Sequence, residues 1–342
     1  MKNSRFLTVL FLLSILIAFF LGFFVGGIIR DSGGEEESTE SPVQSAAEES
    51  PSAAPSEAMS AEPEPTVEQP VETDEPADEP VSDPSAESGD TDLSGLKASL
   101  DTRLADYISD WVVLVEDLQS GEQITSATNG LTTSSPVTSA SVIKLFIAGA
   151  VYDAAAKDGK EIDELTKISL KKMISVSDNE SANNLIRQLG NGDGDNGFAA
   201  VNAFIESIGC TSTKLNRFFL GEGEENLVSA ADCASVLEMI YNGTYVSQQA
   251  SADILEMLKN QERTTKIPSG LAEFSDVSSA NKTGELPGPD HDITENDVAI
   301  VYTPNGNYIL CILATKINNP VDAVNTIIDI SREVCEFYNP GE

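Results

Sequence analysis

Two residues near the middle of the chain, Ser141 and Lys144, have types and spacing suited to acyl transfer. They lie in "TSASVIKLFIAG", at the start of an apolar stretch that predicts a buried helix. Residues three apart share one helix face, so the lysine can reach the serine hydroxyl. Burial lowers the pKa of a lysine, and a hydroxyl nucleophile needs such an adjacent base. The pair predicts an activated serine near the positive end of a helix; the alternative is that Ser141 only caps the helix.

The S-x-x-K spacing alone is weak evidence, because it occurs three times: Ser94/Lys97, Ser141/Lys144 and Ser169/Lys172. Only the second pair opens a predicted buried helix. The first lies at the edge of a low-complexity segment, and the third lies in a lysine-rich, exposed pattern. The chain has a single histidine, so a Ser-His-Asp triad has little support and lysine is the natural base.

Two further motifs follow in order along the chain. S-D-N at 177–179 precedes a predicted helix, and taken alone it is an ordinary N-cap. K-T-G at 282–284 ends a predicted strand, and its lysine taken alone is an ordinary surface residue. The ordered set of three motifs favours a single site.

This set resembles the signature of the class A β-lactamase-like serine hydrolases, in the superfamily of β-lactamases and penicillin-binding proteins. "SVIKLFIAGAVYDA" is similar to the nucleophile helix of that family, and "SDNESANNLIRQLG" to its S-D-N helix. The similarity covers 93–342. It implies an enzyme that acts on β-lactams or peptidoglycan-type peptides through an acyl-enzyme, without a cofactor or metal.

The resemblance implies roles for the residues that match the first two motifs. Ser141 would be the nucleophile, and Lys144 would take and return its proton. Ser177 would relay a proton to the leaving nitrogen. Asn179 would bind the substrate amide and hold Lys144.

It also implies roles for the residues of the third motif. Lys282 and Thr283 would bind the substrate carboxylate, with Gly284 as a further substrate-binding residue. The backbone N–H groups of Glu285 and Ser141 would form the oxyanion hole.

One loop departs from the family pattern. "TKLNRFFLGEGEENLVSA" (213–230) matches the arginine of the family at Arg217, but Phe219 stands where the family has the glutamate that activates the deacylating water. Three acids of this loop are out of register, and as solvated charges they need no catalytic role: Glu222, Glu224 and Glu225. Weak deacylation is therefore expected.

Two other departures concern the walls of the pocket. The segment between Lys144 and Ser177 is short for the family. The strand after K-T-G contains no arginine to help bind a carboxylate, while Glu285 and the acidic segment 288–297 lie at the expected pocket mouth. An anionic penicillin would approach against that field.

The elements needed to position these motifs can be read from hydrophobic periodicity. Strands are expected at 111–124 (two, with a turn), 277–285 and 296–316 (a hairpin), and helices at 141–157, 167–175, 179–190, 196–208, 229–242, 248–260 and 319–338. The expected fold is α/β (α+β): one antiparallel sheet flanked by terminal helices, with an inserted all-α lobe. The resemblance implies that this fold is of the β-lactamase/transpeptidase type. Ligand sites favour the seam between such lobes.

The first part of the chain predicts an anchor and a tether. After a short cytoplasmic N-terminus (1–5), residues 6–29 form an uncharged run of about 24 residues, long enough to span a bilayer. Residues 31–92 contain 20 acids and no base with little apolar bulk, which predicts a disordered stalk. The positive-inside rule places the hydrolase domain (93–342) outside a single-pass cell membrane. Signal-peptide cleavage after "GG" is the alternative.

Charge and cysteine content exclude other classes. The segment 93–342 has 36 acids and 17 bases, a formal charge near −19, which argues against nucleic acid as a partner. The four cysteines and one histidine lack zinc-site spacing. Cys311 and Cys335 fit core positions, while Cys210 and Cys233 flank one loop, and a disulfide between them is left open.

Taken together, the sequence predicts a membrane-anchored extracellular serine hydrolase, acylated at Ser141 by a β-lactam or a cell-wall peptide amide. Two alternatives remain: a true β-lactamase that hydrolyses β-lactam antibiotics, and a catalytically inactive peptidoglycan-binding or sensor module.

Overall fold

The computed structural model describes residues 92–288 and 292–341. The predicted N-terminus 1–5, the predicted span 6–29 and all but the last residue of the predicted stalk 31–92 lie outside the described residues. Within 92–288 and 292–341, no helix is long and apolar enough to cross a membrane.

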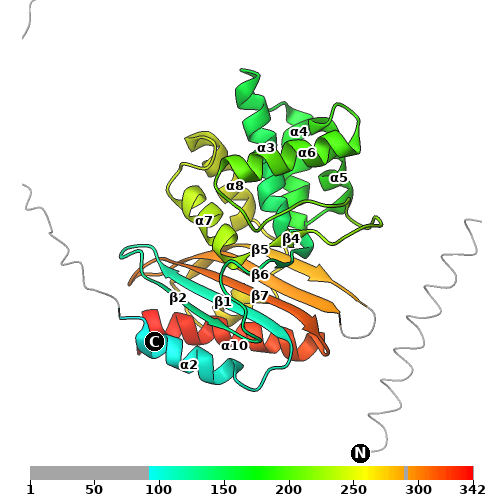
Figure 1. Ribbon diagram of the computed structural model, residues 1–342. Helices are drawn as coiled ribbons and strands as arrows, with labels where there is room; N and C mark the ends of the chain where they lie inside the picture. Colours follow the sequence, from blue (N-terminus) through cyan, green and yellow to red (C-terminus); the bar gives the residue numbers. More distant parts are fainter. Residues whose placement is uncertain (1–91, 289–291, 342) are drawn as a thin grey trace, which may run out of the picture. The chain divides into compact units, whose positions relative to one another are not determined.

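A five-stranded antiparallel sheet joins the two ends of the described chain (Figure 1), in the order β2-β1-β7-β6-β5. Its strands are β1 (Asp110–Asp117), β2 (Gln123–Ala127), β5 (Ser278–Leu286), β6 (Ile293–Tyr302) and β7 (Tyr308–Ile317). β1 pairs along its whole length with β7, from Asp110 opposite Thr315 to Asp117 opposite Tyr308. The prediction of one antiparallel sheet built from the terminal strands is confirmed.

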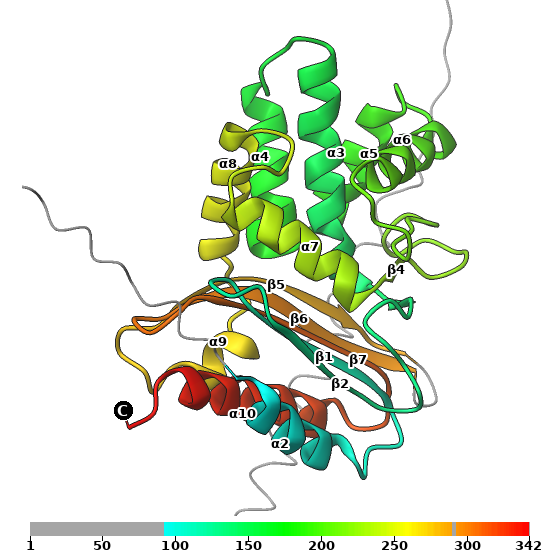
Figure 2. The same cartoon turned by 60° about the vertical axis from the view of Figure 1, so that its left-hand side comes forward.

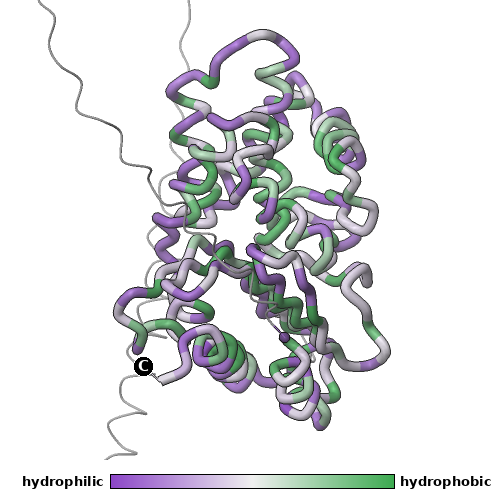
Figure 3. Tube along the Cα trace, turned by 90° about the vertical axis from the view of Figure 1, so that its left-hand side faces the viewer, coloured by the Kyte–Doolittle hydropathy of each residue, from purple (hydrophilic) through white to green (hydrophobic). Residues whose placement is uncertain are grey.

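Each face of the sheet is covered by helices, so its strands are apolar on both sides. In β1, Trp111, Val113 and Val115 pack into one hydrophobic cluster, and Val112 and Leu114 pack into the other. The first cluster lies beneath α2 (Ser94–Leu104), α9 (Ile267–Gly270) and α10 (Pro320–Tyr338). Figure 2 shows these helices on one face of the sheet and the helical lobe on the other. In Figure 3 the hydrophobic colour gathers on the strands and on the helix faces turned toward them.

The sequence between β2 and α9 forms the expected helical lobe. Its helices are α3 (Lys144–Lys157), α4 (Glu164–Lys171), α5 (Asn179–Leu189), α6 (Gly194–Ser207), α7 (Ala230–Tyr241) and α8 (Gln248–Lys259). A two-stranded ribbon, β3 (Val137–Thr138) with β4 (Leu227–Val228), lies beside them. α3 runs through the lobe and is fully buried from Lys144 to Tyr152, as its nearly continuous apolar surface predicts.

Three local features differ from the predicted elements. The helix expected at 141 begins as a 3₁₀ turn, η1 (Ala140–Ile143), and becomes α-helical at Lys144. A π-helical turn, η2 (Lys172–Val176), continues α4 toward the S-D-N motif. α2 had not been predicted, because only three leucines at four-residue spacing face the sheet among polar neighbours.

All four cysteines are buried free thiols, so the disulfide left open between Cys210 and Cys233 is not formed. Cys210 Sγ lies 4.0 Å from the Asp232 carbonyl oxygen, and Cys233 lies inside α7. Burial raises the pKa of Cys210 to about 12. Cys311 and Cys335 lie in the core as predicted.

Candidate active site

Ser141 lies in the η1 turn, directly before α3. The preceding residue, Ala140, has φ +44°, a left-handed conformation that non-glycine residues rarely adopt. This turn directs the chain into the α3 N-terminus, where backbone N–H groups and the helix dipole favour negative charge. Ser141 is half-buried, whereas every residue from Val142 to Val151 is buried. Ser141 is therefore a reachable hydroxyl at the positive end of a buried helix.

Lys144 is the centre of a hydrogen-bond network that joins the first two motifs. Its Nζ donates to Ser141 Oγ at 3.1 Å, to Asn179 Oδ1 at 2.7 Å and to the Ser177 carbonyl oxygen at 2.7 Å. Ser177 Oγ lies at 3.4 Å. The side chain is 0 % exposed, so these oxygens replace its water shell. The amine is held in hydrogen-bond reach of the candidate nucleophile.

The environment of Lys144 makes its amine a base near neutral pH. Burial is the main cause and lowers the pKa to about 7, while nearby Asp178 raises it and Arg263 lowers it further. A pKa near the working pH suits general-base catalysis, since the amine is then often neutral and still basic.

The S-D-N motif combines helix capping with the site. Asp178 is the N-cap of α5 and accepts the Ser181 N–H at 2.7 Å. Ser177, just before it, has φ +63°. This conformation directs both its carbonyl and its hydroxyl to Lys144. The capping interpretation is thus correct for Asp178, while its two neighbours contact the candidate base.

The K-T-G motif lies on β5 at the edge of the sheet. Lys282 is fully buried, and its Nζ donates to Ser177 Oγ and to the Thr283 carbonyl oxygen, both at 2.9 Å. Burial, helped by the positive charge of Lys144, lowers the pKa of Lys282 well below its usual range. Ser177 Oγ therefore lies between two lysine amines. Both amines have lowered pKa values, and both are within hydrogen-bond distance of this hydroxyl.

Gly284 allows β5 to approach η1 closely. A Cβ at this position would lie 2.8 Å from the Ser139 carbonyl oxygen and 3.0 Å from Val142 Cγ2. The close approach brings the backbone of Glu285 next to Ser141, and both residues line the same cleft. Their N–H groups are the pair that the resemblance implies for an oxyanion hole.

This cleft has a volume of about 160 Å³ and lies at the seam between the helical lobe and β5. Ser141, Asn179 and Glu285 line it, together with Phe219 and Leu220. The predicted site residues are brought together in and directly behind this cleft, although they come from three separate parts of the chain.

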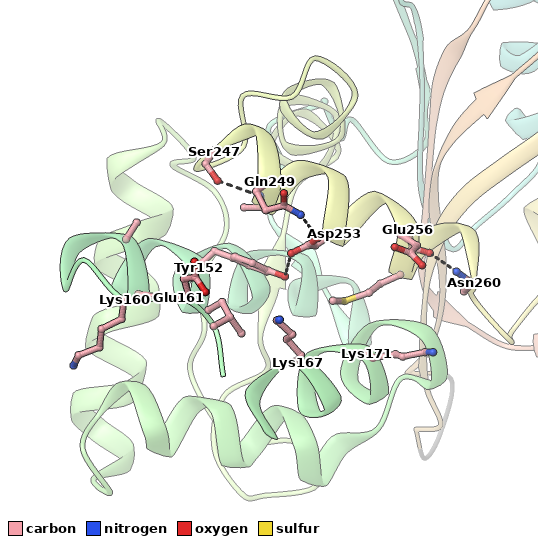
Figure 4. A pocket seen from close by; sticks show the side chains of 15 residues that line it. Tyr152, Lys160, Glu161, Lys167, Lys171, Ser247, Gln249, Asp253, Glu256 and Asn260 are labelled. Carbon is pink, nitrogen blue, oxygen red and sulfur yellow. Dashed lines mark hydrogen bonds between the residues drawn. The ribbon is translucent and has the colours of Figure 1, made fainter. Parts of the chain in front are cut away.

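A larger cavity, of about 570 Å³, lies elsewhere in the helical lobe, between α3, α4 and α8. Figure 4 shows Tyr152 and Asp253 at its centre, with Lys167 and Lys171 on the α4 side. Both Asp253 carboxylate oxygens are bonded, one to Tyr152 Oη at 2.9 Å and the other to Gln249 Nε2 at 2.7 Å. None of the predicted site residues lines this cavity.

Phe219 occupies the place where the family pattern has a glutamate. Its ring centroid lies 4.4 Å from Lys144 Nζ. Its backbone is fixed by Asn183, whose side chain accepts from Phe219 N at 2.9 Å and donates to Phe219 O at 3.1 Å. An apolar ring cannot hold or deprotonate water, so this position provides no base for deacylation.

Among the three out-of-register acids, Glu222 and Glu224 are exposed as expected. Glu225 differs, because it lines the cleft and forms a 2.5 Å ion pair with Arg217. Arg217 also donates to the Gly221 carbonyl at 2.6 Å and so closes the loop. Glu225 is therefore part of the loop structure rather than a solvated charge.

Two cations that contact the cleft residue Glu285 were not found by sequence reasoning. Arg263 and Lys266 lie in the connection between α8 and α9, and both contact the Glu285 carboxylate, Arg263 at 2.6 Å and Lys266 at 3.5 Å. Glu285 lies at the cleft as predicted, but its charge is paired with these two cations, which the sequence analysis did not expect. In the sequence they are two basic residues of an aperiodic segment, "QERTTKIP", and their burial is not visible there. This signal was too weak to place them beside Glu285.

Comparisons with known proteins agree with this fold. The model of the family described as "Beta-lactamase enzyme family" matches residues 167–338. Among solved structures, a β-lactamase from Sphaerobacter thermophilus has 22% identity and a TM-score of 0.60, covering 72% of this chain and 98% of its own. PBP-A has 21% identity and a TM-score of 0.61, covering 72% and 97%. A PBP-A mutant solved as an acyl-enzyme complex with penicillin G gives the same values. No curated protein matches.

The fold and the three ordered motifs define a class A β-lactamase-like serine hydrolase. The chain belongs to the beta-lactamase enzyme family. Within the described ranges, no group of three or more His, Cys, Asp or Glu side chains is arranged to hold a metal ion.

Proposed function

We propose that this chain is a membrane-anchored extracellular serine hydrolase that is acylated at Ser141 and releases the acyl group slowly. One observation carries the proposal: the buried Lys144 amine, with a pKa near 7, lies 3.1 Å from Ser141 Oγ. A neutral amine at that distance accepts the hydroxyl proton as the oxygen attacks a carbonyl.

The rest of the site supports the following steps. The N–H groups of Ser141 and Glu285 stabilise the oxyanion. Ser177, bonded to Lys144 and Lys282, passes a proton to the leaving nitrogen. Asn179 keeps Lys144 in place and presents its amide to the substrate. The bond that breaks joins the substrate carbonyl to its nitrogen, and Ser141 Oγ replaces that nitrogen.

A peptide-like amide is the substrate class best supported. Among the described residues, β5 pairs with β6 and forms one edge of the sheet, and such an edge can accept an extended chain. The cleft lies along that edge. Cell-wall peptide amides and β-lactams both present an amide carbonyl to such an edge, and the PBP-A mutant solved with penicillin G supports the second.

Slow release follows from Phe219. Hydrolysis of an acyl-enzyme needs a water next to the ester and a group to deprotonate it. Phe219 places an aromatic ring beside Lys144, and Glu225 is paired with Arg217. The acyl-enzyme should therefore persist for minutes or longer.

The membrane anchor and extracellular location rest on the sequence of 6–29 and on the two basic residues before it. An amide hydrolase that acts on cell-wall peptides would work on that side of the membrane.

Replacing Ser141 by Ala tests the proposal against the rival binding or sensor module. The enzyme interpretation expects loss of all reaction with an ester substrate, with unchanged affinity for a bound peptide measured by calorimetry. Equal turnover by Ser141→Ala would show that the nucleophile assignment is wrong.

A further inference from the structure

Glu285 lines the cleft, and beside it four charged side chains form a compact group: Arg263, Lys266, Glu285 and Glu295. Arg263 Nη1 lies 2.6 Å from Glu285 Oε2, and Lys266 Nζ lies 3.5 Å from Glu285 Oε1. Lys266 Nζ also contacts Glu295 Oε2 at 2.6 Å. We call these four residues the mouth cluster. Both carboxylate oxygens of Glu285 are thus engaged by cations.

The mouth cluster has no net charge, with two cations and two anions. Lys266 is 1 % exposed, so solvent and substrate reach the cluster mainly through Arg263, which is 48 % exposed, and Glu285, which is 32 % exposed. A substrate carboxylate arriving here would meet an arginine that is already paired. It would add a second negative charge beside Glu285.

Lys282, the lysine of the K-T-G motif, cannot take the place of Arg263 in binding a substrate carboxylate. Lys282 is 0 % exposed, and its amine already donates to Ser177 Oγ and Thr283 O. Lys144 is equally buried and donates to Ser141, Ser177 and Asn179. Arg263 is therefore the cation of this group that a ligand could best approach.

We propose that Glu285 is a built-in substitute for a substrate carboxylate: it occupies Arg263 and so makes the cleft select substrates that are uncharged next to the scissile bond. The class that fits is an interior peptide amide, or a peptide whose end is amidated or esterified. This inference rests on the proposed acylation of Ser141 and names the substrates of that same site.

The test compares a substrate that carries a carboxylate with its uncharged methyl ester. The full-length chain is mixed with benzylpenicillin or with benzylpenicillin methyl ester, and the acylation rate is followed by intact mass. The readout is the acid-to-ester rate ratio, which cancels general effects on the site. Wild type should show a ratio of one or less. Glu285→Gln keeps the backbone N–H and the side-chain shape but frees Arg263. It should raise the acid-to-ester ratio about tenfold or more, because one charge-assisted hydrogen bond contributes a free energy of that size.

Glu262→Gln is the matched control. Glu262 is exposed and adjacent to Arg263 in sequence, and its exchange removes the same charge in the same shape without touching the mouth cluster. Its ratio should stay within about twofold of wild type, because exposed charges interact weakly. An equal ratio in Glu285→Gln and Glu262→Gln would overturn the proposal, as would a wild type that already prefers the acid tenfold.

A binding measurement separates this inference from the proposed function. In the Ser141→Ala background no acylation is needed, and the affinities of the acid and the ester are compared with and without Glu285→Gln. If no variant is acylated, the acyl-enzyme proposal is wrong. A higher acid-to-ester affinity ratio in the Ser141→Ala/Glu285→Gln chain than in Ser141→Ala would still support the role of Glu285. An unchanged ratio, or no binding of the acid by the double variant, would overturn it.

Discussion

The rate of Ser141 acylation should depend on pH in a way set by Lys144. The amine must be neutral to accept the serine proton, and its pKa is lowered to about 7 by burial. The neutral fraction then rises from about 1% at pH 5 to about 90% at pH 8, so the acylation rate should rise about 90-fold over this range and level off above it. An unperturbed lysine would instead give a rate that still rises tenfold per pH unit at pH 9.

The assay is a single-turnover measurement of adduct formation by intact mass, in a series of buffers from pH 5 to pH 9. Because Lys144 and Lys282 both contact Ser177, the midpoint describes the lysine pair. Lys144→Arg keeps the positive charge but cannot lose its proton at these pH values, and it should be at least about 100-fold slower throughout. A flat profile between pH 5 and pH 8, or a Lys144→Arg variant with the wild-type profile, would refute the role of Lys144 as base.

Three further predictions concern stability and release. Glu116 is buried on β1, and burial together with the charge of Glu238 raises its pKa to about 7. The carboxyl therefore holds its proton better in the folded than in the unfolded chain. Its contribution to stability is lost as the pH rises from 4.5 to 7. Glu116→Gln should therefore gain up to about 3 kcal/mol on wild type between pH 4.5 and pH 8 in urea unfolding, less where solvent screens the group, and a pH-independent difference would contradict this. Phe219→Glu should shorten the acyl-enzyme lifetime, measured by intact mass after excess β-lactam is removed, while Phe219→Leu should not; equal lifetimes in both variants would show that this position does not limit release. Gly284→Ala would place its Cβ 2.8 Å from the Ser139 carbonyl oxygen, so it should cost about 1–3 kcal/mol in urea unfolding and slow acylation at least tenfold; wild-type stability and rate would show that the close approach of β5 is unnecessary.

Much of the fold could be predicted because the relevant signals are periodic. The apolar runs of β1, β6 and β7 and the continuous apolar surface of α3 are each explained by burial on more than one side. α2 was missed because its three buried leucines are too few to stand out among polar neighbours. The family was identified from motifs in a fixed order, and motif order is visible in the sequence.

The geometry of the site depended on tertiary contacts that no local pattern encodes. The left-handed conformations of Ala140 and Ser177 are held by the packing around them, since neither residue type favours them. Arg263 and Lys266 reach Glu285 only because the α8–α9 connection packs beside β5. In the sequence these two residues are ordinary loop charges. Their pairing changes the expected electrostatics of the cleft mouth.

The central claim is that Ser141 forms an acyl-enzyme that lasts. The most direct test is to mix the full-length chain with a β-lactam, as the acid and as the methyl ester, follow the intact mass over time, and map any adduct by peptide digestion. The account predicts an adduct on Ser141 that persists for minutes, and none in Ser141→Ala. Steady hydrolysis of the β-lactam without an accumulating adduct, or an adduct of equal size on the Ser141→Ala chain, would contradict it.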